Sequence, residues 1–241
     1  MVCRDSADLA RKAADRFIAL ALDAMARSGR FAVALSGGST PRELYALLGS
    51  FPYKDRLDWT RVHLFWGDER CVPPDHPESN FGMVRSTLLS QVSIPAPNIH
   101  RMAGEKVPEE GAAEYERELR GFFGSTISRF DLILLGIGED GHTASLFPDS
   151  EALDEGEHLV AAIYLDKLRS WRLTLTYPAI NAAAEIAFLA AGKNKSPIVK
   201  DLLGPDANSS NYPAARVRPV NGRLTWFVTE DAAHEGFALR R

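Results

Sequence analysis

The hydrophobic positions along the chain alternate between the spacing of helices and that of buried strands. Residues 6–28 place apolar side chains such as Leu9 and Phe17 on one stripe, which predicts a helix that Gly29 ends. The run Phe31–Leu35 that follows is continuously apolar. Such runs are typical of strands that are buried on both faces of a parallel sheet.

The same alternation continues to the end of the chain. Further strands are predicted at residues 62–66, 130–137, 159–165, 173–176, 186–191 and 224–228. Further helices are predicted at residues 41–48, 80–92, 109–123 and 196–203, with a short helix after the last strand. Repeated strand–helix units predict an α/β fold with a doubly wound, mostly parallel sheet flanked by helices. The stretch 204–219 is rich in Pro, Asn, Ser and Ala and indicates a loop, so we expect one domain over residues 1–241.

Composition supports a folded chain and excludes two classes of partner. The 241 residues are 45% hydrophobic and 25% charged, as in an ordinary globular protein. The net charge of −4 lacks the basic excess of a nucleic-acid binder. The apolar stretches are far shorter than the ~18 residues of a membrane span. We therefore expect neither nucleic acid nor membrane as a partner, and a monomer or weak homo-oligomer.

Cysteine usage and the first residues indicate the compartment. Cys3 and Cys71 are the two cysteines, and their spacing fits neither a zinc motif nor a disulfide framework. The segment Met1–Asp5 lacks the apolar run of a signal peptide. A reducing, cytoplasmic location is the expectation.

The first candidate site is the turn Leu35–Pro41, which follows a buried strand and opens a helix. Thr40 is predicted to be the N-cap, with Glu43 completing a capping box. Gly37 and Gly38 allow the backbone to approach a ligand closely, and a helix start suits a phosphate. A phosphate site and a plain strand-to-helix turn fit this pattern about equally well.

Two common motifs are excluded at this turn. The Gly-Lys-Ser/Thr ending of a P-loop is missing. Pro41 stands where the nucleophile elbow of a serine hydrolase requires glycine.

The second candidate site is Trp66–Arg70, at the end of another predicted strand. Its Asp68 and Arg70 suit either a solvated turn or a ligand crevice, and the carboxyl end of a buried strand favours the crevice. Arg70 is suited to forked contacts with a phosphate. Ser79 and Asn80 are predicted to cap the next helix, so Asn80 is interpreted as structural.

The third candidate site is Leu135–Pro148, which combines glycines, two acids and His142 after the most apolar strand. Histidine titrates near neutrality and is the commonest general base, and a neighbouring acid can orient its ring. We therefore interpret His142 as catalytic. No histidine pair has the spacing of metal ligands on a helix, so no metal site is predicted.

A fourth candidate site, Ala191–Pro197, also joins a predicted strand to a helix. Lys193 and Lys195 both suit an anion there, and a solvated turn fits the sequence equally well. Arg172, at the start of another strand, is a weaker candidate. Four such loops meeting at one edge fit a small phosphorylated substrate and acid–base chemistry.

Three of these segments together resemble the 6-phosphogluconolactonases, within the glucosamine-6-phosphate isomerase/6-phosphogluconolactonase family. They are Leu35–Pro41, Trp66–Arg70 and Gly138–Pro148, and the resemblance runs from the first helix to the last strand. The related deaminases share the first segment. Their third segment carries a glutamate where this chain has Phe147, which disfavours ring opening by that route.

The resemblance implies a modified Rossmann-type sheet like that of the ribose-phosphate isomerase and CoA-transferase group, no cofactor, and hydrolysis of 6-phospho-D-glucono-1,5-lactone. It implies that His142 is the general base and that Asp68 and Asp140 shape and charge the site. Lys195 matches a lysine that alanine usually follows, whereas Ser196 follows here, so Lys193 stays an alternative. The substrate-binding residues implied by the resemblance are Ser36, Gly37, Gly38, Ser39, Thr40, Arg70, Gly141, Arg172 and Lys195.

Two other functions were weighed against this interpretation. An amino-sugar phosphate deaminase or aldose–ketose isomerase uses the same fold, and Phe147 argues against it. A sugar-phosphate sensor of the kind found in transcription regulators usually carries a DNA-binding module. Here about 30 residues precede the first predicted strand, and their pattern is that of one amphipathic helix.

Overall fold

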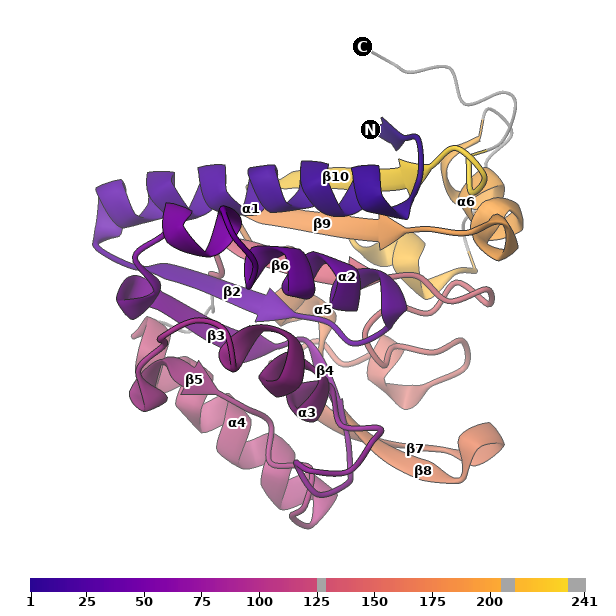
Figure 1. The fold of residues 1–241 in the computed structure, drawn as a ribbon. Helices are drawn as coiled ribbons and strands as arrows, with labels where there is room; N and C mark the ends of the chain where they lie inside the picture. Colours follow the sequence, from indigo (N-terminus) through magenta and orange to yellow (C-terminus); the bar gives the residue numbers. More distant parts are fainter. Residues whose placement is uncertain (125–128, 205–210, 234–241) are drawn as a thin grey trace.

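A seven-stranded parallel sheet forms the centre of the molecule (Figure 1). The computed structural model describes residues 1–124, 129–204 and 211–233. The strand order across the sheet is β1 (Val2–Cys3), β10 (Arg223–Thr229), β9 (Glu185–Ala190), β6 (Leu132–Gly136), β2 (Phe31–Leu35), β3 (Val62–Trp66) and β5 (Ile99–His100). All neighbouring pairs are parallel, so their carboxyl ends lie at one edge.

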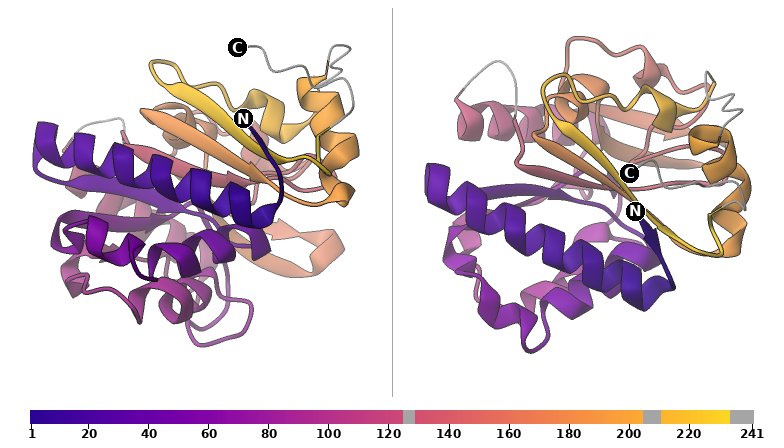
Figure 2. Two further views of the ribbon diagram at one scale, coloured as in Figure 1. Left: turned by 45° about the horizontal axis from the view of Figure 1, so that its top comes forward. Right: turned by 90° about the horizontal axis from the view of Figure 1, so that it is seen from above.

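Helices cover both faces of this sheet (Figure 2). They are α1 (Ser6–Ser28), α2 (Ser39–Leu48), α3 (Asn80–Val84), α4 (Pro108–Phe123), α5 (Tyr177–Asn181) and α6 (Ser196–Leu203). The predicted α/β class is confirmed, and so is the first helix with its Gly29 cap, which has a φ of 81°.

A second, antiparallel sheet carries part of the candidate site. It consists of β4 (Asp68–Arg70), β8 (Ser170–Leu175) and β7 (Val160–Leu165). The hairpin β7–β8 extends beyond the main body in Figure 1. Sequence patterns placed Asp68 and Arg70 in a turn or a ligand crevice after a strand and did not predict strand β4. The three polar residues of β4 pair with a strand about a hundred positions away and leave no local signal.

Three other predictions need correction. Thr40 is not the N-cap: α2 begins at Ser39, Gly38 is its N-cap, and no side chain caps it. The helix predicted over residues 80–92 is shorter: the α-helix covers Asn80–Val84, and a π-helical turn follows at Arg85–Leu89. The short helix expected after the last strand is absent up to residue 233, where the chain forms turns, and the rest of it lies outside the described residues.

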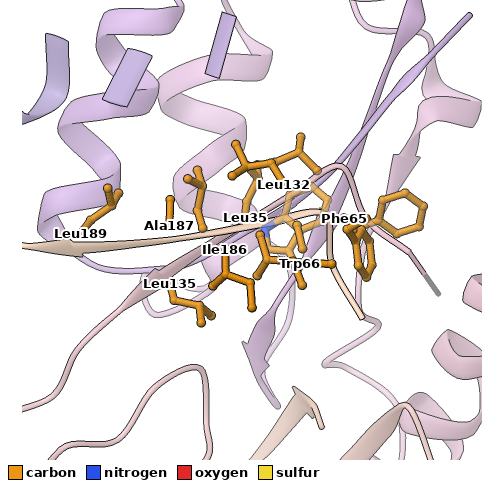
Figure 3. Packing of buried hydrophobic residues seen from close by; sticks show 14 of the residues in the cluster. Leu35, Phe65, Trp66, Leu132, Leu135, Ile186, Ala187 and Leu189 are labelled. Carbon is orange, nitrogen blue, oxygen red and sulfur yellow. The ribbon is translucent and has the colours of Figure 1, made fainter. Parts of the chain in front are cut away.

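The core lies where the central strands meet the helices. Figure 3 shows side chains from β2, β3, β6 and β9 packed together, among them Leu35, Leu135 and Ile186. Every residue of β2 and of β9 is buried, as continuous apolar runs predict. Helix α1 adds Phe17, whose ring meets that of Phe31 edge-on at 5.2 Å. Full burial of one such side chain contributes roughly 1.5–3 kcal/mol.

Two buried tyrosines fix the points at which the chain leaves the sheet. The Tyr45 hydroxyl accepts from the Ser36 N–H at 3.0 Å and donates to the Ser36 carbonyl at 2.9 Å. The Tyr115 hydroxyl does the same at Trp66, at 2.9 and 3.2 Å. The backbone N–H and carbonyl groups of Ser36 and Trp66 are thereby hydrogen-bonded by the two tyrosines. The ends of β2 and β3 are therefore held in place directly beneath the candidate site.

Candidate active site

A cavity of about 220 Å³ opens at the carboxyl ends of β2, β3, β6 and β9. Ligands in open α/β sheets gather at this edge. All four candidate loops contribute to the cavity. Its lining consists of Ser36, Gly37, Gly38, Ser39, Thr40, Pro41, Asp68, Arg70, Asn80, Gly136, Ile137, Gly138, His142, Ala144, Leu189, Ala191 and Lys195.

His142 reaches this cavity with one ring nitrogen engaged by Asp140. The Nδ1 atom lies 2.6 Å from Asp140 Oδ1, and the same oxygen accepts from the His142 backbone N–H at 3.1 Å. Because a carboxylate only accepts, Nδ1 carries the hydrogen and Nε2 of the neutral ring keeps its lone pair. Burial alone raises the pKa of Asp140, but the hydrogen bonds from His142 outweigh burial and lower it below its ordinary value.

A tight turn brings the ring and the carboxylate together. The Gly138 N–H donates to the His142 carbonyl at 2.8 Å, and the Gly141 N–H donates to the Gly138 carbonyl at 3.1 Å. A Cβ at Gly138 would lie 2.1 Å from His142 Nδ1, so any larger residue at this position would displace the ring. Phe147 stacks on the His142 ring with 4.0 Å between centroids. The ring is thus fixed by the turn, by Asp140 and by Phe147, with 31% of its side chain exposed.

Asp68 brings a buried carboxylate to the same cavity. It is 7% exposed and lies on β4, opposite Thr174 of β8. Its Oδ2 atom accepts from Ser145 Oγ at 2.9 Å, and its Oδ1 atom accepts from Asn80 Nδ2 at 3.3 Å. Asp68 and His142, which sequence analysis placed on separate loops, therefore face one cavity.

Arg70 and Arg172 form a cross-strand pair of like charges. They are direct partners in the β4–β8 ladder, and Arg70 lines the cavity. Burial, and then the charge of Arg70, lowers the pKa of Arg172 below its ordinary value. Arg70 donates to the Glu78 carbonyl at 2.6 Å. Among the described residues neither arginine has an ion pair to a carboxylate, and like charges opposite each other are unfavourable unless an anion joins them. Arg172 itself is not part of the cavity lining.

The remaining predicted anion ligands lie on two strand–helix turns. Lys195, half-buried in the short turn Lys193–Lys195, lines the cavity, whereas Lys193 is exposed outside it. Within the part of the chain that the structure describes, the side chain of Lys195 has no hydrogen bond or ion pair. Ser36 lines the cavity and is 4% exposed, and its Oγ has no hydrogen-bond partner among the described residues. A buried hydroxyl without a partner is unfavourable, and a ligand in the cavity would supply one.

Several contributors to the site escaped sequence analysis. Asn80, interpreted as structural, lines the cavity as well as following the Ser79 cap. Ser145 touches Asp68 from 77 positions away, a contact that no local pattern indicates. Glu69 is buried but serves the start of α3, accepting from the backbone N–H groups of Asn80 and Phe81 at 2.7 and 2.8 Å.

Gly141 and Asp140 adjoin the cavity without lining it. Gly141 has a φ of 78°, and its carbonyl accepts from the Ala214 N–H at 3.0 Å. In the described ranges no group of three or more His, Cys, Asp or Glu side chains is arranged to hold a metal ion. None of the described helices is long and apolar enough to cross a membrane.

Comparison with known proteins assigns the family. The family model described as "Glucosamine-6-phosphate isomerases/6-phosphogluconolactonase" matches residues 4–226. The chain belongs to this family. The 6-phosphogluconolactonase of a Nostoc species is 41% identical over 238 residues, covering 97% of this chain and 96% of its own. The human 6-phosphogluconolactonase is 43% identical, covering 85% of this chain and 80% of its own.

The fold of a solved family member also matches. The structure of 6-phosphogluconolactonase from Trypanosoma cruzi superposes with a TM-score of 0.88 at 28% identity. The match covers 99% of this chain and 96% of the other. The family resemblance seen in the sequence motifs is confirmed.

Proposed function

We propose that this protein hydrolyses 6-phospho-D-glucono-1,5-lactone to 6-phospho-D-gluconate, the second step of the oxidative pentose phosphate pathway. One observation carries the proposal: His142, whose Nε2 has no partner among the described residues, shares a small cavity with Arg70 and Lys195. A base and two cations in one cavity suit a molecule that carries both an ester carbon and a phosphate. The relatives named 6-phosphogluconolactonase support the same substrate.

The phosphate is proposed to bind at the start of α2. The turn 36–40 offers the unpaired N–H groups of a helix whose N-cap, Gly38, supplies no side chain. The Ser36 hydroxyl, Arg70 and Lys195 add a hydrogen-bond donor and two positive charges. An anion there also relieves the repulsion between Arg70 and Arg172. Contacts so far from the reacting carbon position the substrate rather than take part in the chemistry.

The proposed chemistry needs no covalent enzyme intermediate. His142 Nε2 takes a proton from a water molecule, whose oxygen attacks the lactone carbon C1. Backbone N–H groups of the glycine turns stabilise the tetrahedral oxyanion. The oxyanion then collapses, the bond from C1 to the ring oxygen breaks, and the imidazolium returns the proton to that oxygen. Asp140, at 2.6 Å, stabilises the imidazolium between the two transfers.

The position of Phe147 distinguishes this chemistry from deamination. The Phe147 ring stacks on the His142 ring. The related deaminases carry a glutamate at the position of Phe147. An apolar ring cannot relay a proton to an amino group. It excludes water from one face of the imidazole and leaves Nε2 as the reactive atom.

The direct test is a lactonase assay on the wild-type protein. The phosphorylated lactone is generated in situ, and its disappearance is followed above the spontaneous rate, with unphosphorylated gluconolactone as the control. We expect a large acceleration of the phosphorylated lactone alone. Ammonia release from glucosamine 6-phosphate, without acceleration of the lactone, would replace this proposal with the deaminase.

A further inference from the structure

Asp68 differs from the other acids near the cavity. Among the described lining residues it is the sole carboxylate, whereas Asp140 stands behind His142 and Glu69 serves the start of α3. The proposed chemistry uses neither of its oxygens. A buried carboxylate facing a ligand cavity is unfavourable unless it is hydrogen-bonded, so its partners show what holds it there.

Two buried side chains hold the Asp68 carboxylate, one on each oxygen. Ser145 Oγ donates to Oδ2 at 2.9 Å. Asn80 Nδ2 donates to the Asp68 carbonyl at 2.9 Å and to Oδ1 at 3.3 Å. Ser145 is 1% and Asn80 is 2% exposed. These contacts fix the orientation of the carboxylate, because rotating it would leave a buried donor without a hydrogen-bond acceptor.

The two holding residues are themselves fixed by other elements. The Ser145 N–H donates to Thr174 Oγ1 on β8 at 3.2 Å. The Asn80 side chain fills the space where a Cβ of Gly37 would stand, since that atom would lie 1.9 Å from Asn80 Oδ1. The carboxylate is therefore set against the turn 36–40 on one side and the segment carrying His142 on the other.

Each oxygen of Asp68 keeps capacity to accept another hydrogen bond. A carboxylate offers about four acceptor sites, and the protein side chains occupy one on each oxygen. The proposed function puts the sugar lactone between the turn 36–40 and His142, within the cavity that Asp68 lines. Hydroxyl donors are the groups that such an acceptor recognises.

We propose that Ser145 and Asn80 are positioning residues that fix Asp68 as the acceptor for a ring hydroxyl of the substrate. This inference rests on the proposed lactonase function and adds the choice among lactones to it. Asp68 selects polyhydroxylated lactones, and Ser145 and Asn80 act through it without touching the reacting atoms. A deoxy substrate leaves the Asp68 acceptor unpaired and is therefore disfavoured.

The test measures kcat/KM of wild type, Ser145→Ala and Asp68→Asn on three phosphorylated lactones: the full substrate, its 2-deoxy analogue and its 3-deoxy analogue. Wild type is expected to prefer the full substrate over at least one analogue by about 10- to 100-fold, the worth of one hydrogen bond to a charged group. Asp68→Asn and Ser145→Ala are expected to lose most of that preference, because a misplaced or neutral acceptor no longer distinguishes the hydroxyl.

Two further variants separate positioning from general damage. Thr176→Val removes another buried hydroxyl, which donates to the His158 carbonyl away from the cavity, and is expected to keep the wild-type preference. Asn80→Leu keeps a similar volume against Gly37 but removes the donor to Asp68, so it is expected to lose the preference as Ser145→Ala does. If Ser145→Ala does not fold, the Asn80 variant tests the positioning role in its place.

The outcomes are distinguishable. Wild type that hydrolyses the full lactone without discriminating against either analogue overturns the inference and leaves the proposed function standing. The inference is also overturned, with the proposed function left standing, by a Ser145→Ala or Asn80→Leu variant that is slower on all three lactones by one common factor, because that is the sign of a structural role alone. Wild type that accelerates none of the lactones overturns the proposed function, and this inference with it.

Discussion

At the scale of single residues, the cavity combines a proton-transfer group with two cationic side chains. His142 is held through Nδ1 by Asp140, and the side chains of Arg70 and Lys195 line the same cavity. Sequence analysis selected these residues because carboxyl ends of parallel strands share an edge. It preferred Lys195 to Lys193 on resemblance alone, and Lys195 is the one that lines the cavity.

Arg70 gives the prediction that belongs to this scale. Arg70→Gln is expected to raise KM for the phosphorylated lactone about 10- to 100-fold, because it removes charge-assisted hydrogen bonds to the phosphate. The kcat should change far less, since the phosphate contacts hold in substrate and transition state alike. Steady-state kinetics measure both values. Arg223→Gln, an exposed position at the start of β10, is the matched control. An unchanged KM in Arg70→Gln would remove Arg70 from the phosphate site.

At the scale of elements, the turn after β6 controls the geometry of His142. In Gly138→Ala, the new Cβ would stand 2.1 Å from His142 Nδ1 and 2.6 Å from Asp140 Oδ1, so the pair must move. We expect kcat to fall about 100-fold, the effect of a misplacement of about 1 Å, and KM to stay within a few-fold. Wild-type kcat in this variant would show that the His142–Asp140 geometry is not needed.

The control for that variant is another glycine with open space. Gly121→Ala lies on an exposed position of α4, and no atom stands within 4 Å of the new Cβ. It is expected to leave kcat unchanged and to raise the free energy of unfolding by roughly 0.5–1 kcal/mol, because alanine favours helix over glycine. Thermal or denaturant unfolding measures that change.

Some secondary-structure elements could be predicted from the sequence and others could not. The apolar runs of β2 and β9 and the capped stripe of α1 were predicted within a residue, since burial and caps are local signals. Strand β4 was missed because its pairing with β8 is distant in sequence. The N-cap prediction at Thr40 was wrong: α2 begins at Ser39, with Gly38 as its N-cap at a φ of 105° and no side-chain cap. The hydrogen bond from Ser145 to Asp68 was not predicted because it spans 77 positions in the sequence.

At the scale of the whole molecule, a pair of histidines, His63 half-buried and His100 buried, links stability to pH. His63 Nδ1 lies 3.1 Å from His100 Nε2, and His100 Nδ1 lies 2.6 Å from Glu118 Oε1, on the strands β3 and β5. Burial, with the nearby charges of His100 and Arg30, lowers the pKa of His63 to about 4. The folded protein therefore keeps His63 neutral between pH 6.5 and about 4, whereas the unfolded chain binds a proton there.

The sign of the pH effect follows from that difference. The part of the free energy of unfolding that comes from keeping His63 neutral is complete above pH 6.5 and is lost as the pH falls toward about 4. His63→Gln keeps a donor for His100 and removes the titration. We therefore expect the free energy of unfolding to fall less in His63→Gln than in wild type over this range, measured by denaturant unfolding at several pH values. Equal slopes would mean that His63 titrates alike in both states.

The central claim is that His142 performs the proton transfers while the turn 36–40 holds the far end of the substrate. The most direct measurement is single-turnover hydrolysis of 6-phosphogluconolactone by His142→Asn, with folding checked by its unfolding transition. The account predicts a folded protein whose turnover is lower by about two to four powers of ten, the usual worth of acid–base catalysis. A folded His142→Asn protein that hydrolyses the lactone at the wild-type rate would contradict it.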